Sequence, residues 1–441
     1  MGKKRDIGDK DNSNSKGTQK EKYYISAGIK LYKENEENGK SPTYFKNEEA
    51  LRKLEEPTSR EDYTETDFKR EIKEEVTKFI NKKFDNIVFL AGAGTSVVTT
   101  KSGEIVSKYG KTMKGIAEIV YDVLDNDKEC FNLIELAEKV RYKNEQVKDN
   151  NEQVKDNNEQ VKDDKKLLLN KFNLEDFLSS VIHYESYVDD IDKEKYTKTK
   201  HKILQTIKNN TIYKYDKKIH KHGALLNILT KKVEAPSKLS IVTTNYDTLF
   251  EEAAAEGNYT IFDGFKFLPE PQFDSDIFDW NLVKEVSDIK TRELEYNPKV
   301  FNLIKIHGSR TWKRVSESKI IRMTNGEKIS AEETVMIFPS SEKYAQSYQE
   351  PYFDLFTKFQ ELLKRKNTLL VTAGFSFSDN HIFRMITQAV KNNKEFALLV
   401  TDIDIEQPEN KNWQYLLDLV DDYHQVAFLK ATMNQDLVGY L

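Results

Sequence analysis

The hydrophobic positions of this chain predict strands and helices that alternate along most of its length. Short runs of apolar and β-branched residues predict buried strands at 87–90, 239–244, 303–306, 335–338, 368–372, 396–400 and 426–429. Apolar residues at helical spacing predict helices at 63–84, 174–182, 350–365, 379–392 and 410–421. Strands without polar alternation, separated by helices, favour an α/β fold built on a doubly wound, mostly parallel sheet.

A long helical segment separates the first predicted strand from the others. Helices are predicted from residue 111, at 130–140 and, after 174–182, up to about residue 230. We therefore expect a helical insertion at about 102–236 within one domain of residues 61–441. Residues 1–60 are rich in charged and polar side chains, so we expect a partly disordered N-terminal extension there.

A perfect repeat lies inside the predicted insertion. The sequence Asn-Glu-Gln-Val-Lys-Asp occurs at 144–149, 151–156 and 158–163. One valine in every seven residues is too thin a stripe for a coiled coil, which needs two apolar positions per heptad. We expect residues 144–164 to form a solvated linker or helix extension at a surface that tolerates change.

Composition and charge narrow the classes of function. The net charge of -5 does not fit a protein built to coat nucleic acid, and we expect no sequence-specific nucleic-acid contact. Cys130 is the only cysteine, so one chain cannot build a thiolate zinc cluster, and a reducing cytoplasm fits best. No apolar run approaches membrane-spanning length, so no membrane partner is expected.

Two polar turns follow the first two predicted strands. Gly92-Ala93-Gly94-Thr95-Ser96 could let the backbone approach a pyrophosphate, with Ser96 as a hydroxyl donor, although a tight turn alone explains the glycines equally well. Thr243-Thr244-Asn245-Tyr246-Asp247 ends the second strand. Either Asn245 or Asp247 could cap the helix that follows, but both together exceed what a cap needs.

Two further turns follow later strands. His307-Gly308-Ser309 offers an imidazole that can exchange protons near neutral pH, although a surface or core histidine is the commoner case. In the turn 374–381, Gly374 and Ser376 suit contact with a ribose or phosphate, Ser378 or Asp379 suits a helix cap, and His381 suits packing or solvent. Parallel strands end at one edge of a sheet, so we expect all four turns to form one ligand site.

The order of these motifs resembles the sirtuin-like superfamily over about residues 65–430, and most closely the bacterial sirtuin-like NAD hydrolases of antiphage defence. Besides the four turns, the matching segments are 173–179 and 338–344. The resemblance implies a Rossmann-like NAD-binding domain. The zinc-binding cysteines, the Gly-Ile-Pro and Phe-Arg segment and the Phe-Gly-Glu of deacylating sirtuins are missing here, which argues against an acyl-lysine substrate.

The resemblance also implies the chemistry and its residues. NAD would be the substrate, without a metal, and would be hydrolysed to ADP-ribose and nicotinamide in abortive infection. Asn245 and His307 would be catalytic. The glycine turn and Ser96 would hold the pyrophosphate, Asp247 would lie near the nicotinamide, Gly374 and Ser376 near the adenosine-side ribose, and Asp402 near adenine-side hydroxyls. The full set expected to bind NAD is Gly92, Ala93, Gly94, Ser96, Thr244, Asp247, Gly374, Ser376 and Asp402.

Two alternative functions stay open at this point. One is ADP-ribosyl transfer to a protein or nucleic acid, and the other is a non-catalytic module that senses NAD or another nucleotide. A pure binding site would not need Asn245 and His307, which argues against the second alternative. Because uncontrolled NAD hydrolysis would kill the host, the resemblance further implies an off-state, relieved by homo-oligomerisation or by a partner such as a HerA-type ATPase.

Overall fold

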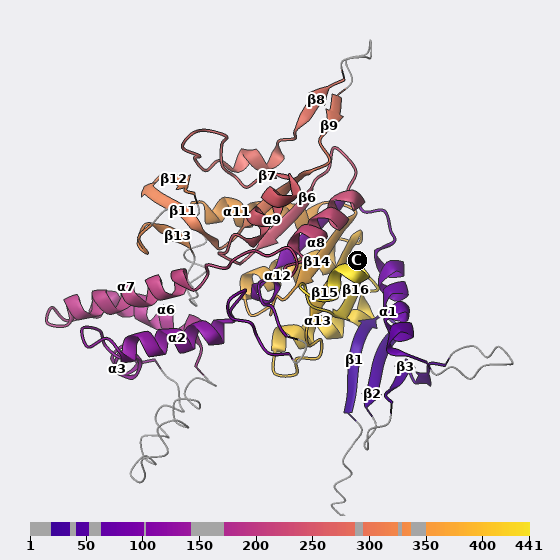
Figure 1. Cartoon of the computed structure of the whole chain (residues 1–441), viewed down its shortest axis with the longest axis horizontal. Coiled ribbons are helices and arrows are strands. Elements are labelled where there is room, and N and C mark those ends of the chain that lie inside the picture. Colours follow the sequence, from indigo (N-terminus) through magenta and orange to yellow (C-terminus); the bar gives the residue numbers. More distant parts are fainter. Residues whose placement is uncertain are drawn as a thin grey trace, which may run out of the picture.

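The computed structural model describes residues 19–35, 41–52, 63–100, 103–142, 172–286, 294–324, 329–336 and 350–441. An 11-stranded sheet lies at the centre, in the order β4-β3-β2-β1-β16-β15-β14-β5-β6-β10-β7 (Figure 1). Its parallel part consists of β16 (Val426–Lys430), β15 (Phe396–Asp402), β14 (Thr368–Ala373), β5 (Asn86–Ala91), β6 (Leu239–Thr243), β10 (Val300–Lys305) and β7 (Thr260–Phe262). The predicted mostly parallel α/β fold is confirmed.

Helices cover both faces of the sheet, as a doubly wound fold requires. On one face α11 (Tyr352–Lys364), α12 (Asn380–Asn392) and α13 (Lys411–Asp422) pack in the same apolar cluster as Val88 and Leu90 of β5. The opposite face carries Ile87 and Phe89, packed with α1 (Glu65–Ile80), α8 (His222–Leu229), α9 (Leu249–Gly257) and α14 (Leu437–Tyr440). Successive residues of a strand point to opposite faces, so one unbroken apolar run supplies both cores.

The segment between β5 and β6 forms a separate helical lobe beside the sheet (Figure 1). Its helices share their own apolar cluster and are α2 (Met113–Asp125), α3 (Leu133–Lys139), α6 (Leu174–Tyr184) and α7 (Lys193–Asn209). The last helix of the segment, α8, packs on the sheet instead. The repeat at 144–163 lies outside the described residues. Short 3-10 helices occur at Glu185–Tyr187 (η2), Thr230–Lys232 (η3) and Ser275–Asp279 (η4).

The predicted strand at 335–338 does not join the parallel sheet, which corrects that expectation. Its described part belongs to β13 (Thr334–Met336), which pairs antiparallel with β11 (Gly308–Ser316) beside β12 (Lys319–Arg322). Gly308, at φ +81°, turns the chain out of β10 into this small sheet, and a Cβ there would lie 2.1 Å from the carbonyl oxygen of Val335. Residues 337–338, and with them the matching segment 338–344, lie outside the described residues.

A separate two-stranded sheet joins β8 (Val283–Glu285) and β9 (Leu294–Tyr296).

Four N-terminal strands extend the sheet beyond β16. They are β1 (Gln19–Ser26), β2 (Ile29–Asn35), β3 (Thr43–Lys46) and β4 (Glu49–Ala50), and β1 pairs antiparallel with β16. Tyr24, Leu31 and Tyr44 are buried under α1. The sequence pattern placed residues 1–60 outside the domain, but residues 19–35 and 41–50 continue its sheet.

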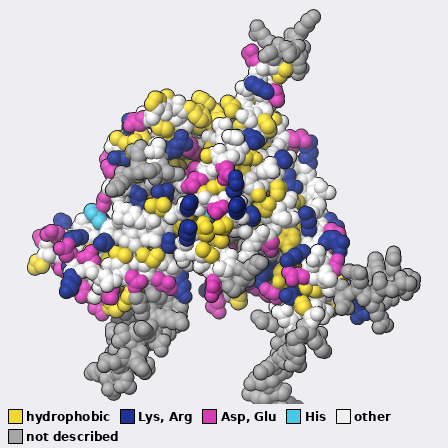
Figure 2. Space-filling view, in the orientation of Figure 1, with side chains coloured by type: hydrophobic (Ala, Val, Ile, Leu, Met, Phe, Trp, Pro, Cys, Tyr) yellow, Lys and Arg dark blue, Asp and Glu magenta, His cyan; other side chains and the backbone are white. Residues whose placement is uncertain are grey.

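The described helices and the visible surface give two further facts. None of the helices in the described ranges combines the length and the apolarity that a membrane crossing requires. On the face shown in Figure 2, Lys and Arg side chains are interspersed with Asp and Glu. No extended field of one charge sign therefore lies over that face.

Candidate functional site

The register of the central strands brings the predicted turns to one edge. Ala373 of β14, Ala91 of β5, Thr243 of β6 and Lys305 of β10 lie in one row across the sheet. The residues after each strand therefore leave the sheet side by side. Because β6 lies on one side of β5 and β14 on the other, this edge is a topological switch point, where open α/β sheets bind ligands.

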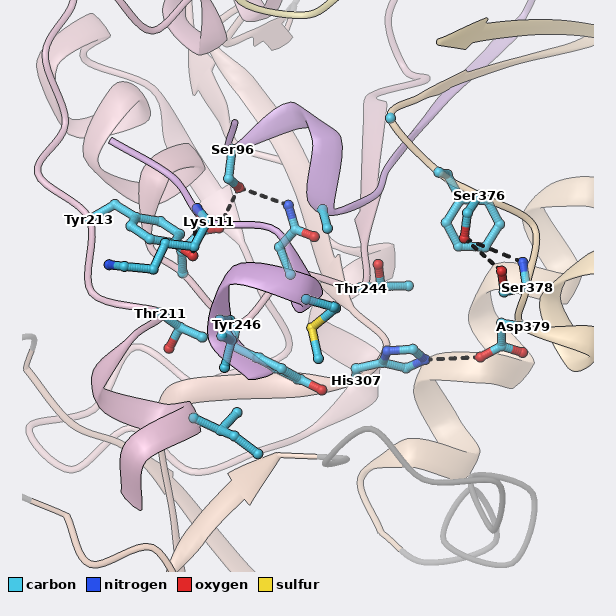
Figure 3. Close-up of a pocket in the computed structure, with 18 residues that line it drawn as sticks. Ser96, Lys111, Thr211, Tyr213, Thr244, Tyr246, His307, Ser376, Ser378 and Asp379 are labelled. Carbon is cyan, nitrogen blue, oxygen red and sulfur yellow. Dashed lines mark hydrogen bonds and ion pairs between the residues drawn. The ribbon is translucent and has the colours of Figure 1, made fainter. Parts of the chain in front are cut away.

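A cavity of about 200 Å³ lies at this edge. It is lined by most of the predicted site residues, namely Ala93, Ser96, Thr244, Asn245, Asp247, His307, Gly374 and Ser376. The segment between β5 and β6 also lines the cavity, through Met113, Ile116 and Ile207 and through Lys111, Thr211 and Tyr213. Figure 3 shows the last three on the side of the cavity away from Ser376 and Asp379. Gly92, Gly94 and Asp402 do not line the cavity. The structure thus brings together eight of the eleven predicted residues.

The glycine turns pack against each other. The amide of Gly94, in the short helix η1 (Ala93–Thr95), donates to the carbonyl of Gly374 at 3.0 Å. A Cβ on Gly374 would lie 2.5 Å from the Cα of Gly94, and its φ of +55° also favours glycine. The glycines at 92 and 94 were expected to let a pyrophosphate approach. In the structure they let the β14 turn approach closely, and the pyrophosphate contact stays a prediction. Asn434 anchors the end of η1, because its side-chain amide donates to the carbonyls of Thr95 and Val97 at 2.9 Å each.

Asn245 has a fixed orientation in the cavity wall. Its Nδ2 donates to Gly92 O at 2.9 Å, to Thr95 Oγ1 at 3.1 Å and to Ser96 Oγ at 2.9 Å. A carbonyl oxygen can only accept, so the Gly92 contact identifies the nitrogen end of the amide. No described residue donates to Oδ1, so this atom is the acceptor that Asn245 can offer to a ligand or water.

Ser96 and Asp247 hold the Asn245 amide in place. Ser96 Oγ donates to Asp247 Oδ2 at 2.6 Å. Its predicted donation to a phosphate stays a prediction. Asp247 Oδ1 accepts from the amide of Leu249 at 3.1 Å, at the start of α9. Asp247 therefore combines the expected cap with support for Ser96, and one hydrogen-bonded chain runs from Asp247 through Ser96 to Asn245.

A buried lysine braces the same turn and was missed in the sequence. Lys305 is 2% exposed, donates to the carbonyl oxygen of Asp247 and lies 2.8 Å from the Glu251 carboxylate. Burial raises the pKa of Glu251, and the ammonium of Lys305 opposes that rise. The signal was a charged residue between two isoleucines of a buried strand, in Ile304-Lys305-Ile306.

His307 pairs with a carboxylate on α12. Its Nε2 lies 3.3 Å from Asp379 Oδ2, and both side chains are almost fully buried (Figure 3). Asp379 also performs the predicted cap, because Oδ1 accepts from the amides of His381 and Ile382. His381 stacks on Phe356 at 4.9 Å between ring centroids, which agrees with the packing role expected for it. The pairing with His307 was missed, because nothing in the local sequence of either turn indicates the other.

Of the two residues predicted to contact the adenosine side of NAD, Ser376 lines the cavity and Asp402 does not. Ser376 lines the cavity with its hydroxyl 3.0 Å from that of Ser378. Asp402 ends β15, one strand beyond β14, and its Oδ1 accepts from the amides of Ile403 and Asp404. Burial raises the pKa of Asp402 to about 6. Its bonds in the structure stabilise its own turn.

The helical lobe adds side chains that no sequence motif indicated. Lys111 is the one lysine or arginine among the described residues that line the cavity. Its Nζ lies 5.7 Å from the centroid of the Tyr213 ring, and its backbone amide donates to the Tyr213 hydroxyl. Burial, aided by the Asp247 carboxylate, raises the pKa of Tyr213. Within the part of the chain that is described, no cluster of three His, Cys, Asp or Glu side chains is arranged to hold a metal ion.

One family of known proteins matches the part of the chain that carries this site. Residues 239–418 match a family model described as a SIR2-like domain. The match runs from the first residue of β6 into α13, so it includes Asn245, His307 and the β14 turn. It supports a sirtuin-like relationship, and because SIR2-like domains are typically NAD-dependent enzymes, it supports an NAD-related activity in general. A search of curated proteins found no match to the chain.

Proposed function

We propose that this protein is an NAD hydrolase that cleaves the bond between nicotinamide and ribose. The observation that carries the proposal is the meeting of Asn245 and His307 in one cavity at the switch point of the sheet, both within the residues 239–418 that match a SIR2-like domain. The cavity volume of about 200 Å³ is below the roughly 300–1,000 Å³ of sites that enclose a whole drug-sized ligand. It suits one end of a dinucleotide, namely the nicotinamide and its ribose.

The chemistry requires few protein groups. When the C1′–N1 bond breaks, its electron pair stays with the nicotinamide nitrogen and neutralises the pyridinium charge, so the leaving group needs no proton. Positive charge develops at C1′, as in glycoside hydrolysis. Water then forms the new C1′–O bond and loses one proton. The protein has to orient the water and the ribose and to keep out other solvent.

The geometry supports a distinct part for each residue. Asn245 offers only Oδ1, so it would accept a hydrogen bond from the attacking water or from a ribose hydroxyl, and its fixed amide would limit where that donor lies. His307, which also lines the cavity, would take the proton as general base. The apolar wall of Met113, Ile116 and Ile207 would limit the access of other water.

Incubation of the purified chain with NAD tests the proposal. We expect nicotinamide and ADP-ribose to appear in equal amounts, measured by chromatography over a range of protein concentrations. Asn245→Ala and His307→Ala should each lower the rate at least about 100-fold. His424→Ala, which changes an exposed histidine after α13, should leave it unchanged.

Other results would contradict the proposal in different ways. Turnover that survives both substitutions would remove Asn245 and His307 from the chemistry. NAD-derived label on a protein or nucleic acid would indicate an ADP-ribosyltransferase. Tight NAD binding without nicotinamide release at any concentration, even with partner proteins and ligands present, would indicate a sensing module. A role in antiphage defence, homo-oligomerisation and a HerA-type partner rest on the family resemblance alone and form part of this proposal.

A further inference from the structure

We propose that Asp379 is a positioning residue that sets the orientation and the protonated nitrogen of His307. This inference rests on the proposed function, because it assigns a partner to the general base of that reaction. Asp379 would thus have two roles, the capping of α12 and the positioning of the catalytic imidazole.

The carboxylate of Asp379 is held rigidly. Its Oδ1 accepts from the amides of His381 at 3.0 Å and Ile382 at 3.2 Å, in the first turn of α12. With one oxygen fixed in this way, Oδ2 lies 3.3 Å from His307 Nε2, which is an ion-pair distance. Both of these atoms are shielded from solvent. A helix cap needs only one carboxylate oxygen, so the second, buried beside an imidazole nitrogen, is available for another role.

The ring of His307 is restrained from other sides as well. Phe356 of α11 lies 6.3 Å from it between ring centroids and stacks on His381 of α12. Figure 3 shows Tyr246 extending below the cavity with its hydroxyl end toward His307. The imidazole therefore has little freedom to rotate, and Nε2 remains the nitrogen that faces the carboxylate.

This arrangement selects one tautomer. A carboxylate can only accept a hydrogen bond, so the hydrogen of neutral His307 is favoured on Nε2. Nδ1 is then the basic nitrogen. In the hydrolysis, the water oxygen bonds to C1′, the C1′–N1 electron pair leaves with nicotinamide, and the water proton moves to Nδ1. Asp379 stays ionised, stabilises the imidazolium and takes no proton, and the proton then passes to solvent.

The surrounding charges do not reverse this effect. The charged or titratable groups that line the cavity with His307 are Lys111, Tyr213, Tyr246, Asp247 and Asp379. His381 and Arg384 follow Asp379 on α12, and Lys305 and Arg310 lie two and three residues from His307 in the sequence. Lys305 lies 2.8 Å from the Glu251 carboxylate, and Asp247 is bound to Ser96 and Leu249. Asp379 is the acidic group at ion-pair distance from His307.

Two substitutions separate positioning from capping. Asp379→Asn keeps an oxygen for the cap but turns an NH₂ donor toward Nε2, which favours the hydrogen on Nδ1. Asp379→Ser keeps a good N-cap and removes the carboxylate. We expect kcat to fall about 100-fold for Asp379→Asn, with KM changed less than about threefold. The acidic limb of the kcat profile should move to lower pH in both variants, because the imidazolium loses its carboxylate.

A matched control removes a cap elsewhere. Thr64→Ala deletes the N-cap of α1, far from the cavity in sequence and fold, and should lower stability without moving the pH limb. If Asp379 only caps α12, Asp379→Ser should behave like wild type in kcat and in its pH profile. That result would overturn the inference.

The tautomer can be read without any turnover. In protein labelled with ¹⁵N-histidine, His307 is assigned as the signal lost in His307→Gln. We expect protonated Nε2 and unprotonated Nδ1 in wild type, and the reverse in Asp379→Asn. Protonated Nδ1 in wild type would overturn the inference. If the expected tautomer is found but no nicotinamide is released, the proposed function fails while the pairing stands.

Discussion

Ser96 shows how one hydroxyl joins two functional side chains. It donates to Asp247 and accepts from Asn245, and it is almost fully buried. Asn245 keeps two other acceptors if the hydroxyl is removed, whereas Asp247 Oδ2 loses the donor that the structure gives it. The larger energetic effect of a change at Ser96 therefore falls on the carboxylate.

We expect Ser96→Ala to lower the free energy of unfolding by about 1–3 kcal/mol, because it leaves a buried carboxylate oxygen without its donor. Nicotinamide release should fall about tenfold as the Asn245 amide loses one of its three contacts. Denaturant unfolding and steady-state kinetics measure the two effects. Ser316→Ala, an exposed serine at the end of β11, is the control and should change neither. Unchanged stability in Ser96→Ala would show that the Ser96–Asp247 bond contributes nothing.

The contact between the two glycine turns gives a second prediction at the residue scale. Gly374→Ala would place a methyl group 2.5 Å from the Cα of Gly94, in a backbone conformation that already disfavours alanine. We expect a loss of more than about 3 kcal/mol of stability, together with loss of nicotinamide release. Gly28→Ala is the matched control, since Gly28 also has positive φ but nothing within 4 Å of its added Cβ. It should lose only about 1–2 kcal/mol, and equal losses in the two variants would contradict the crowding argument.

At the scale of elements, α8 and α9 meet through a buried histidine. His222, the first residue of α8, packs edge-on against Phe250 of α9 at 4.7 Å between ring centroids. Burial, aided by the nearby His220, lowers the pKa of His222 to about 3. Helix α9 follows directly from the turn that carries Asn245, so the stability of this packing bears on the site.

This histidine predicts a pH dependence of stability. Unfolded His222 titrates near 6.5 and folded His222 near 3, so the unfolded state binds the extra proton between these values. Its contribution is fully present above pH 6.5 and is lost as pH falls toward 3. Between pH 6 and 4, we expect this group to lower the free energy of unfolding by up to about 1.4 kcal/mol per pH unit. Urea unfolding at several pH values gives the free energy of unfolding as a function of pH. This free energy should fall less steeply between pH 6 and 4 in His222→Gln than in wild type. An equally steep fall in both proteins would contradict the assignment.

At the scale of the whole molecule, burial decided what the sequence could predict. The central strands are buried on both faces, so their runs of apolar residues predicted them; they are β5, β6, β10, β14, β15 and β16. The strands β1–β4 were not predicted, because charged side chains alternate with the buried Tyr24 and Leu31 and the strands lie at one end of the sheet. The turns that form the site were found by their polar residues. The His307–Asp379 pair was not, because it depends on the packing of two elements that only the folded sheet brings together.

The N-terminal strands predict a consequence of truncation. Deletion of residues 1–62 would remove β1 and leave the edge of β16 with unpaired backbone groups beside Ala427, Phe428 and Leu429. We expect the shortened chain to unfold at lower temperature and to self-associate, as measured by thermal scans and light scattering. Deletion of residues 1–18 removes none of the described contacts and should change neither property. A monomeric, equally stable product of the longer deletion would show that the edge needs no cover.

The anchoring of η1 by Asn434 affects when, during synthesis on the ribosome, the active site can form. Asn434 lies 339 residues after Thr95, whose carbonyl it binds, and Asp379 and the turn of β14 also come late in the chain. A ribosome-bound chain still lacking these segments has Asn245 and the residues that bind its amide. It lacks Gly374 and Asn434, which hold the first glycine turn, and Asp379, the partner of His307. Under the proposed function, a growing polypeptide cannot consume NAD until residues 374–434 have left the ribosome and folded onto the sheet.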